Sequence, residues 1–151
     1  MNIELTEKIL FNPLFTSKLL LMALAGADNG KLKMELAYYV LPLIYNDTIK
    51  DKLVNSTSKS TFNTFLNSDV KVELIVIESL LTNYKKKTKE ALITLSNIYN
   101  VEFSNYLILK EEQKITYSKE KNSVLKDYYK AAFNLGSILS KEDFKRIFYN
   151  L

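Results

Sequence analysis

The chain of 151 residues contains no histidine and no cysteine, and only three glycines. Histidine and cysteine supply most general bases and nucleophiles that work near neutral pH, and nearly all zinc ligands. Their absence excludes a Ser–His–Asp or Cys–His catalytic relay and a zinc site. Gly26 and Gly30 are too few for a glycine-rich phosphate loop, and no nucleotide-binding glycine motif is present. We therefore expect a protein that is not an enzyme and that needs no cofactor, no metal and no small-molecule substrate.

The chain also lacks long hydrophobic runs. Its apolar stretches at residues 19–25 and 36–45 are shorter than the roughly 20 residues of a membrane-spanning helix. Without cysteine it needs no oxidising compartment, and its first residues do not have the pattern of a signal peptide. A length of 151 residues fits one domain, and 47% hydrophobic residues suffice for a core. These features predict a cytoplasmic protein that does not enter a membrane.

The net charge of +4 comes from the second half of the chain. Residues 1–75 hold eight basic and eight acidic side chains, whereas residues 76–151 hold thirteen basic and nine acidic ones. A basic half is typical of proteins that contact nucleic acid or an acidic protein surface. All but one of the 21 basic residues are lysine, so a coding bias toward AT-rich codons also accounts for the excess. Both explanations stay open.

Helical periodicity covers most of the chain. Asn12-Pro13 predicts a helix start, with Asn as N-cap and Pro in the first turn, and residues 14–25 continue almost wholly apolar. A second apolar helix is expected over residues 33–45, kinked at Pro42. The further expected elements are an amphipathic turn with Ile49 and Leu53, helices over residues 61–67, 68–82, 88–98 and 124–136, a break over residues 83–87, Thr88 as an N-cap, and a last helix from Ser140.

After Asn100 the hydrophobic period changes to two, which predicts strands. The expected strands are residues 101–103 and 106–109, followed by a turn over residues 110–113 and a return strand over residues 114–117. A capped helix followed by a hairpin is the layout of a winged helix-turn-helix, in which the helix enters the DNA major groove. The predicted fold is mainly α, with a helical partner-binding region (1–67) and a winged-helix-like lobe with one small β-hairpin and the C-terminal helices (68–151), together one compact unit.

Lysines gather around the predicted helix and hairpin, where phosphate contacts are usual. The candidates for DNA backbone contact are Lys85, Lys86, Lys87, Lys89, Lys110 and Lys114. Acidic residues lie on the same lobe, and no arginine is available there for a bidentate contact to guanine. Winged helices are also common protein-docking modules, so a protein partner is the alternative.

Several segments, taken in order, resemble a known family. They are Phe11-Asn12-Pro13 opening an apolar helix that ends Ala25-Gly26, then Leu36-Ala37-Tyr38-Tyr39-Val40-Leu41-Pro42-Leu43, Ser60 to Leu66, Thr88-Lys89-Glu90-Ala91-Leu92, and Ile147-Phe148-x-x-Leu151. This order is similar to the middle component of bacterial three-component ABC-ATPase systems. These are the Lamassu-type anti-phage modules, in which an SMC/Rad50-like ATPase works with an effector and a small accessory subunit. Ile44-Tyr45-Asn46 and Leu53-Val54 stand where the family usually has His, Arg and Pro.

The resemblance implies a non-catalytic subunit that bridges the ATPase and the effector and lies near DNA. The candidate partner-binding residues are Asn12, Pro13, Phe15, Tyr38, Tyr39, Leu41 and Pro42. The residues themselves are compatible, because the helices near 13–45 carry more apolar surface than one small core requires. In the doublets Tyr38-Tyr39 and Tyr128-Tyr129, one ring is expected to point outward, where tyrosine is a good interface anchor.

Two other classes of function are compatible with the sequence. A stand-alone winged-helix transcription regulator would bind its own promoter with a steep dependence on salt. An enzyme that uses only Lys, Tyr, Ser and carboxylates would need these groups clustered in a polar pocket with shifted pKa values.

Overall fold

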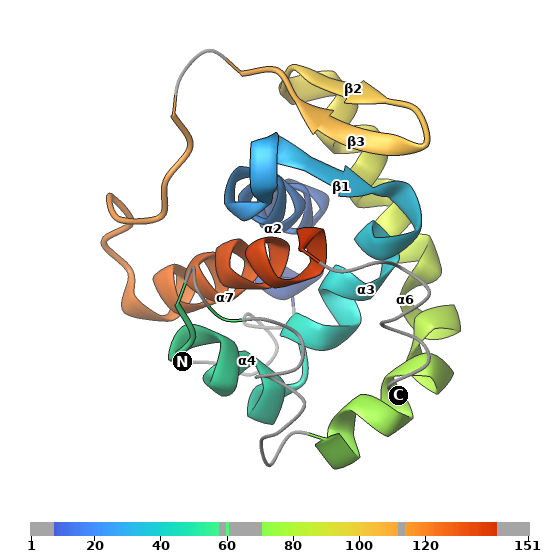
Figure 1. Cartoon of the computed structure of the whole chain (residues 1–151), viewed down its shortest axis with the longest axis vertical. Helices are drawn as coiled ribbons and strands as arrows, with labels where there is room; N and C mark the ends of the chain where they lie inside the picture. The colour runs from blue at the N-terminus through green and yellow to red at the C-terminus, as the bar shows by residue number, and fades with distance from the viewer. Residues whose placement is uncertain (1–7, 58–59, 61–70, 112–113, 142–151) are drawn as a thin grey trace.

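The computed structural model describes residues 8–57, 60, 71–111 and 114–141. This part of the chain is mainly α-helical with one small antiparallel sheet, as the sequence predicts (Figure 1). Its elements are α2 (Pro13–Gly26), the 3-10 turn η1 (Asp28–Gly30), β1 (Lys31–Lys33), α3 (Met34–Ile44), α4 (Asp47–Val54), α6 (Lys71–Ile98), β2 (Val101–Phe103), β3 (Tyr106–Leu109) and α7 (Ser123–Ser140). Within these ranges no helix has the length and apolar character that crossing a bilayer requires.

The centre of the molecule is α2, which packs against α7, α6 and α3 (Figure 1). Its residues from Leu19 to Leu24 are all nearly inaccessible to solvent. The expected helix start is confirmed, because Asn12 adopts an extended backbone and its side chain accepts a hydrogen bond from the amide of Leu14. Most of the apolar surface of α2 and α3 is therefore buried in this chain's own core. Less of it is exposed to a partner than the sequence suggested.

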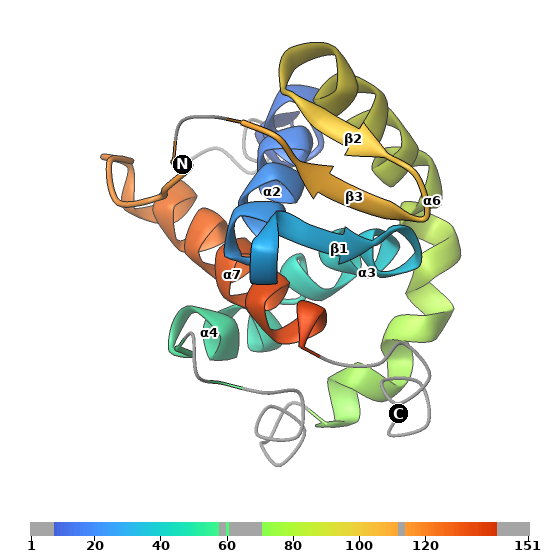
Figure 2. The same cartoon turned by 45° about the horizontal axis from the view of Figure 1, so that its top comes forward.

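The sheet has the order β1–β3–β2, with both pairings antiparallel (Figure 2). The strands predicted at 101–103 and 106–109 are confirmed, but the prediction of a return strand at 114–117 is wrong. The hairpin turns at Ser104 and Asn105, and the other edge of β3 pairs with β1, where Leu32 lies opposite Leu107. Residues 114–117 instead direct alternate side chains onto the helices, and the ring of Tyr117 meets that of Phe133 edge-on, with centroids 5.4 Å apart.

Two helices are longer than predicted. The predicted break over residues 83–87 and the cap at Thr88 are wrong, because α6 is continuous for 28 residues, about 42 Å. Lysine is a good helix former, so the lysine run does not interrupt the helix. Thr88 is fully buried in the middle of α6. The predicted end at Gly136 is also wrong, since α7 continues to Ser140.

The predicted amphipathic turn is the short helix α4, capped by Asn46, with Ile49 and Leu53 fully buried. From α7, Asn134 donates two hydrogen bonds to backbone carbonyls at the end of α4, 2.8 Å to Leu53 and 3.1 Å to Ser56. This buried amide fixes α4 against α7.

Residues from both predicted regions, 1–67 and 68–151, contribute to one buried cluster. The predicted outward ring is absent from the doublet Tyr128-Tyr129, where both side chains are buried. In the other doublet Tyr38 is half-buried and packs against the core, beside the buried Tyr39. The helix predicted over residues 61–67, and residues 142–151 of the helix predicted from Ser140, lie outside the described residues.

Candidate functional site

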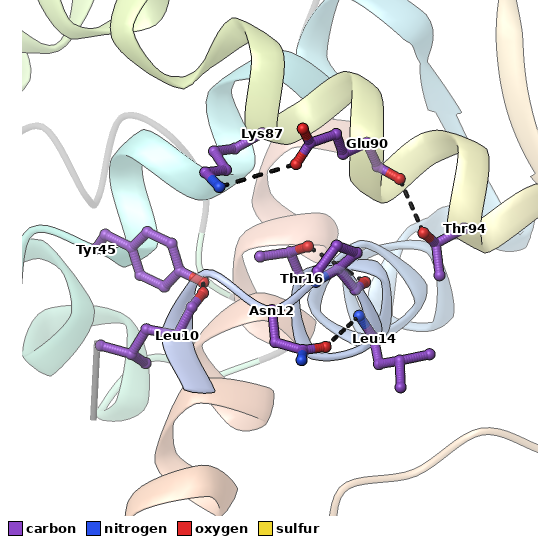
Figure 3. A network of polar contacts seen from close by, with 9 residues as sticks. Leu10, Asn12, Leu14, Thr16, Tyr45, Lys87, Glu90 and Thr94 are labelled. Atoms are coloured by element: carbon purple, nitrogen blue, oxygen red, sulfur yellow. Dashed lines mark hydrogen bonds and ion pairs between the residues drawn. The ribbon is translucent and has the colours of Figure 1, made fainter. Parts of the chain in front are cut away.

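The start of α2 carries the exposed residues of this otherwise mostly buried helix. Asn12 fixes the helix start through its side-chain oxygen, 2.8 Å from the amide of Leu14 (Figure 3). Because Leu14 lies in the first turn, its side chain projects from the end of the helix and is 63% exposed. Phe11, just before the cap, is 37% exposed. Two large apolar side chains, one on each side of Asn12-Pro13 in the sequence, are therefore open to solvent.

An aromatic cluster lies beneath this surface and holds it in place. Its centre is Tyr45 at the end of α3, whose ring lies 5.5 Å from that of Phe11, 5.9 Å from that of Tyr84 and 6.0 Å from that of Tyr128. The hydroxyl of Tyr45 donates to the backbone carbonyl of Leu10 (Figure 3). Burial, with a smaller contribution from Tyr128 and Tyr84, raises the pKa of Tyr45 above the ordinary value of 10.0. The neutral phenol thus fixes the chain just ahead of α2.

Two hollows flank the start of α2. The first has a volume of about 390 Å³ and lies between α2 and α7. Its lining is Lys8, Ile9, Asn12, Leu14, Phe15, Lys18 and Tyr129. The second, of about 380 Å³, lies between the residue before the cap and α6. Its lining is Phe11, Leu80, Asn83, Tyr84 and Lys87. We call the two linings together the α2 N-terminal surface.

The charged side chains that line the two hollows are all lysines. Lys18 lies over the ring of Tyr129, with its ammonium 4.8 Å from the ring centroid, and Lys87 lies 5.8 Å from the centroid of Phe11. Lys87 is also 3.8 Å from the carboxylate of Glu90 in the same helix, a half-exposed pair that contributes little stability (Figure 3). The α2 N-terminal surface is therefore apolar at its floor and positively charged at its rim.

The structure distributes the seven predicted partner-binding residues between this surface and the core. Asn12 and Pro13 are exposed, and Asn12 lines the first hollow. Phe15 is buried, and part of its side chain forms the wall of the same hollow. The other four lie on α3: Tyr39, Leu41 and Pro42 are buried, and Tyr38 is half-buried against the core. Their role in binding a partner stays a prediction.

The six lysines predicted to contact DNA fall into two groups. Lys85, Lys86 and Lys89 are exposed in the middle of α6, with the half-buried Lys87 among them. Lys110 follows β3 beside the end of α6, since its amide donates to the carbonyl of Asn100 at 2.8 Å. That end is roughly 15 Å along the helix from Lys89. Lys110 also pairs with Glu102 at 3.6 Å, and Lys114 is exposed beyond it. The two groups do not form one compact cluster.

Sequence reasoning missed Phe11 and Leu14 as exposed residues. Leu14 belongs to the apolar run over residues 14–25, which predicts burial, and Phe11 is a large apolar residue just before the cap; the position of the cap leaves both exposed. The N-cap signal of Asn12-Pro13 could have indicated this, because side chains in the first turn of a helix lie at its end and not along its buried face.

Comparison with known protein families gives a match over the whole chain. A family model described as ABC-three component (ABC-3C) system Middle Component 3 matches residues 1–151. No curated protein matches the chain, and no solved structure does.

Proposed function

Because the chain belongs to the Middle Component 3 family of ABC-three component systems, we propose that it is the accessory subunit that joins the ATPase of such a system to its effector. The observation that carries the proposal is the family match, which extends over residues 1–151. It is supported by a chain without histidine or cysteine, whose exposed apolar side chains suit contact with other proteins better than catalysis. In this proposal the subunit positions its partners and performs no chemistry of its own.

The physical basis of the proposal is rigidity combined with a limited open surface. α2 is held on several sides by α3, α6 and α7, so the start of α2 is presented on a fixed frame. A surface that is already ordered loses little entropy on binding, which favours a stable complex. The α2 N-terminal surface would contact one partner, and the more distant face of α6 and the hairpin would face the other.

Co-expression with the ATPase and the effector encoded beside this chain tests the proposal. We expect the three proteins to purify as one complex, measured by native mass spectrometry, and the ATPase and effector to separate when this chain is left out. An ATPase–effector complex of the same stability in its absence would contradict the bridging role.

We further propose that the system is of the Lamassu type and protects its host against phage. The measurement is plating efficiency of a panel of phages on cells that carry the complete system or the system without this chain. Loss of protection without this chain, at unchanged levels of the other two proteins, is the expected result. Full protection in its absence would contradict the proposal.

The second candidate is contact with the DNA backbone by a winged-helix-like lobe. Two observations favour it: α6 leads directly into the β2–β3 hairpin, with β1 completing the sheet, and five of the six predicted lysines are exposed. The exposed face of α6 also carries Ile93, which is 62% exposed, and Ile98. These apolar side chains form neither ion pairs nor hydrogen bonds with phosphate. We therefore propose weak contact that does not depend on base sequence, with affinity that falls steeply between 50 and 200 mM salt, on the order of tenfold or more.

Fluorescence anisotropy with two DNA duplexes, one with the sequence of the chain's own promoter and one of unrelated sequence, separates this candidate from a stand-alone regulator. We expect equal affinity for both duplexes, and weaker binding by Lys86→Glu and Lys89→Glu. A strong preference for the chain's own promoter would favour the transcription regulator.

A further inference from the structure

We infer that the α2 N-terminal surface receives an acidic segment of the ATPase subunit, with a large apolar side chain as its anchor. This inference rests on the proposed function and adds where the contact lies and what chemistry recognises it. The anchor would occupy the hollow beside Leu14, and neighbouring carboxylates would meet the lysines at the rim.

The apolar part of the recognition comes from the exposure of Leu14. Its side chain is 63% exposed, although the rest of α2 from Leu19 to Leu24 is almost completely buried. A hollow of about 390 Å³ beside it is lined by Leu14 itself and by Ile9, Phe15 and Tyr129, among others. Apolar side chains in a concave lining release water when a complementary side chain covers them, and such central pockets supply most of the binding energy of interfaces.

The positive charge of the lysines at the rim favours an acidic partner. Lys8 and Lys18 line the first hollow, Lys87 lines the second, and no carboxylate lines either one among the described residues. Within those residues Glu90 pairs with Lys87, and no acidic side chain pairs with Lys18. The ammonium of Lys18 is held above Tyr129, so it is already positioned at the edge of the hollow. A carboxylate of an incoming segment would find an ordered cation there.

The same charge argues against other occupants. A second copy of this chain would bring its own net charge of +4 against the lysine rim, and like charges brought together weaken association. A DNA duplex would suit the lysines but would leave Leu14 and Phe11 against phosphate and sugar, without an apolar partner. An acidic protein segment with an apolar anchor satisfies both properties of the surface.

The test uses the full chain and the ATPase subunit of its own system, with affinity measured by biolayer interferometry at several salt concentrations. We expect Leu14→Ser to weaken binding about tenfold or more, because it removes the apolar contact. The matched control is Ile93→Ser, which removes a side chain of nearly equal exposure, 62%, from α6. This control should bind within twofold of the wild type.

A charge reversal tests the acidic partner separately. Lys18→Glu should weaken binding about tenfold and reduce its dependence on salt, since one ion pair is replaced by a repulsive one. Lys52→Glu makes the same change at an exposed lysine of α4 that lines neither hollow and should leave the affinity within twofold. Circular dichroism spectra of the four variants check that each of them is folded.

The outcomes separate this inference from the proposed function. If the wild type does not bind the ATPase, the proposed function fails. If the wild type binds and both Leu14→Ser and Lys18→Glu bind equally well, the accessory role stands and the site is wrong. If Lys18→Glu binds the ATPase as tightly as the wild type or more tightly, the assignment to an acidic ATPase segment is overturned.

Discussion

A Cβ atom on Gly136 of α7 would overlap the backbone carbonyl oxygen of Ala23 in α2. The contact is mutual, because a Cβ on Gly26 of α2 would overlap the carbonyl oxygen of Phe133 in α7. The two helices therefore touch backbone to backbone, and only glycine permits an approach this close. This contact brings α7 against the helix that presents the α2 N-terminal surface.

We predict that Gly136→Ala destabilises the protein. In an ordinary helix interior, replacing glycine by alanine instead stabilises the helix by about 1 kcal/mol. The new methyl group would force the two helices apart, at a cost of about 1–3 kcal/mol in the free energy of unfolding. Urea denaturation followed by circular dichroism measures the difference. Asn97→Ala, on the exposed face of α6, is the control and should have a small effect. An increase in stability with Gly136→Ala would show that the close approach is absent.

A buried amide gives a second prediction about the same helix. Asn134 donates to the carbonyls of Leu53 and Ser56, and its side chain is almost completely buried. Asn134→Leu keeps a side chain branched at Cγ but leaves these carbonyls without their side-chain donor, so the free energy of unfolding should fall by about 1–3 kcal/mol. Amide hydrogen exchange should accelerate most in α4, the helix whose end the amide secures. Unchanged exchange in α4 would contradict this role of Asn134.

Local signals in the sequence predicted those parts of the fold that local chemistry decides. The cap at Asn12 places the start of α2, and the apolar run after it predicts its burial. The strand at 101–103 follows from alternation of apolar and polar residues, and the strand at 106–109 is a short apolar run behind a turn. Each of these elements carries its own hydrogen-bonding or hydrophobic pattern within about ten residues.

Other elements depend on distant neighbours, and the sequence could not indicate them. β1 is three residues long and exists as a strand because it pairs with the free edge of β3, more than 70 positions away. Gly136 looks like a helix end, but the contact with Ala23 makes it an interior residue. The exposure of Leu14 likewise depends on where α6 and α7 leave α2 uncovered, which no local pattern records.

Thr88 leads to a third prediction. The sequence suggested that its hydroxyl caps a helix, yet it lies buried inside α6 and is a buried side-chain oxygen without a hydrogen-bond partner among the described residues. Removing an unsatisfied buried hydroxyl while keeping the branched shape should stabilise the protein, by about 1 kcal/mol for Thr88→Val. The control is Thr94→Val, because the Thr94 hydroxyl donates to the carbonyl of Glu90 at 3.0 Å and its loss should not stabilise the protein. Equal or lower stability of Thr88→Val would indicate that the hydroxyl has a partner in solution.

The last prediction concerns the stability of the fold at high pH. Burial raises the pKa of Tyr45 above 10.0, and burial also raises the pKa values of Tyr84 and Tyr129. The folded chain therefore favours the neutral phenols. The stability that they contribute is complete below about pH 10, where unfolded tyrosine ionises, and is lost as the pH rises further.

Absorbance at 295 nm and urea denaturation check this expectation over about pH 8–12. In the folded protein some tyrosines should ionise only above the pH at which they ionise in urea, and the free energy of unfolding should fall over the same interval. Tyr45→Phe removes the phenol that is most strongly affected, so the fall should become shallower. Near neutral pH the variant should lose about 1 kcal/mol, because the hydroxyl no longer donates to the carbonyl of Leu10. If all ten tyrosines ionised together near pH 10 in the folded protein, the aromatic cluster beneath the α2 N-terminal surface would be open to water, and the rigid frame on which the proposed contact depends would be absent.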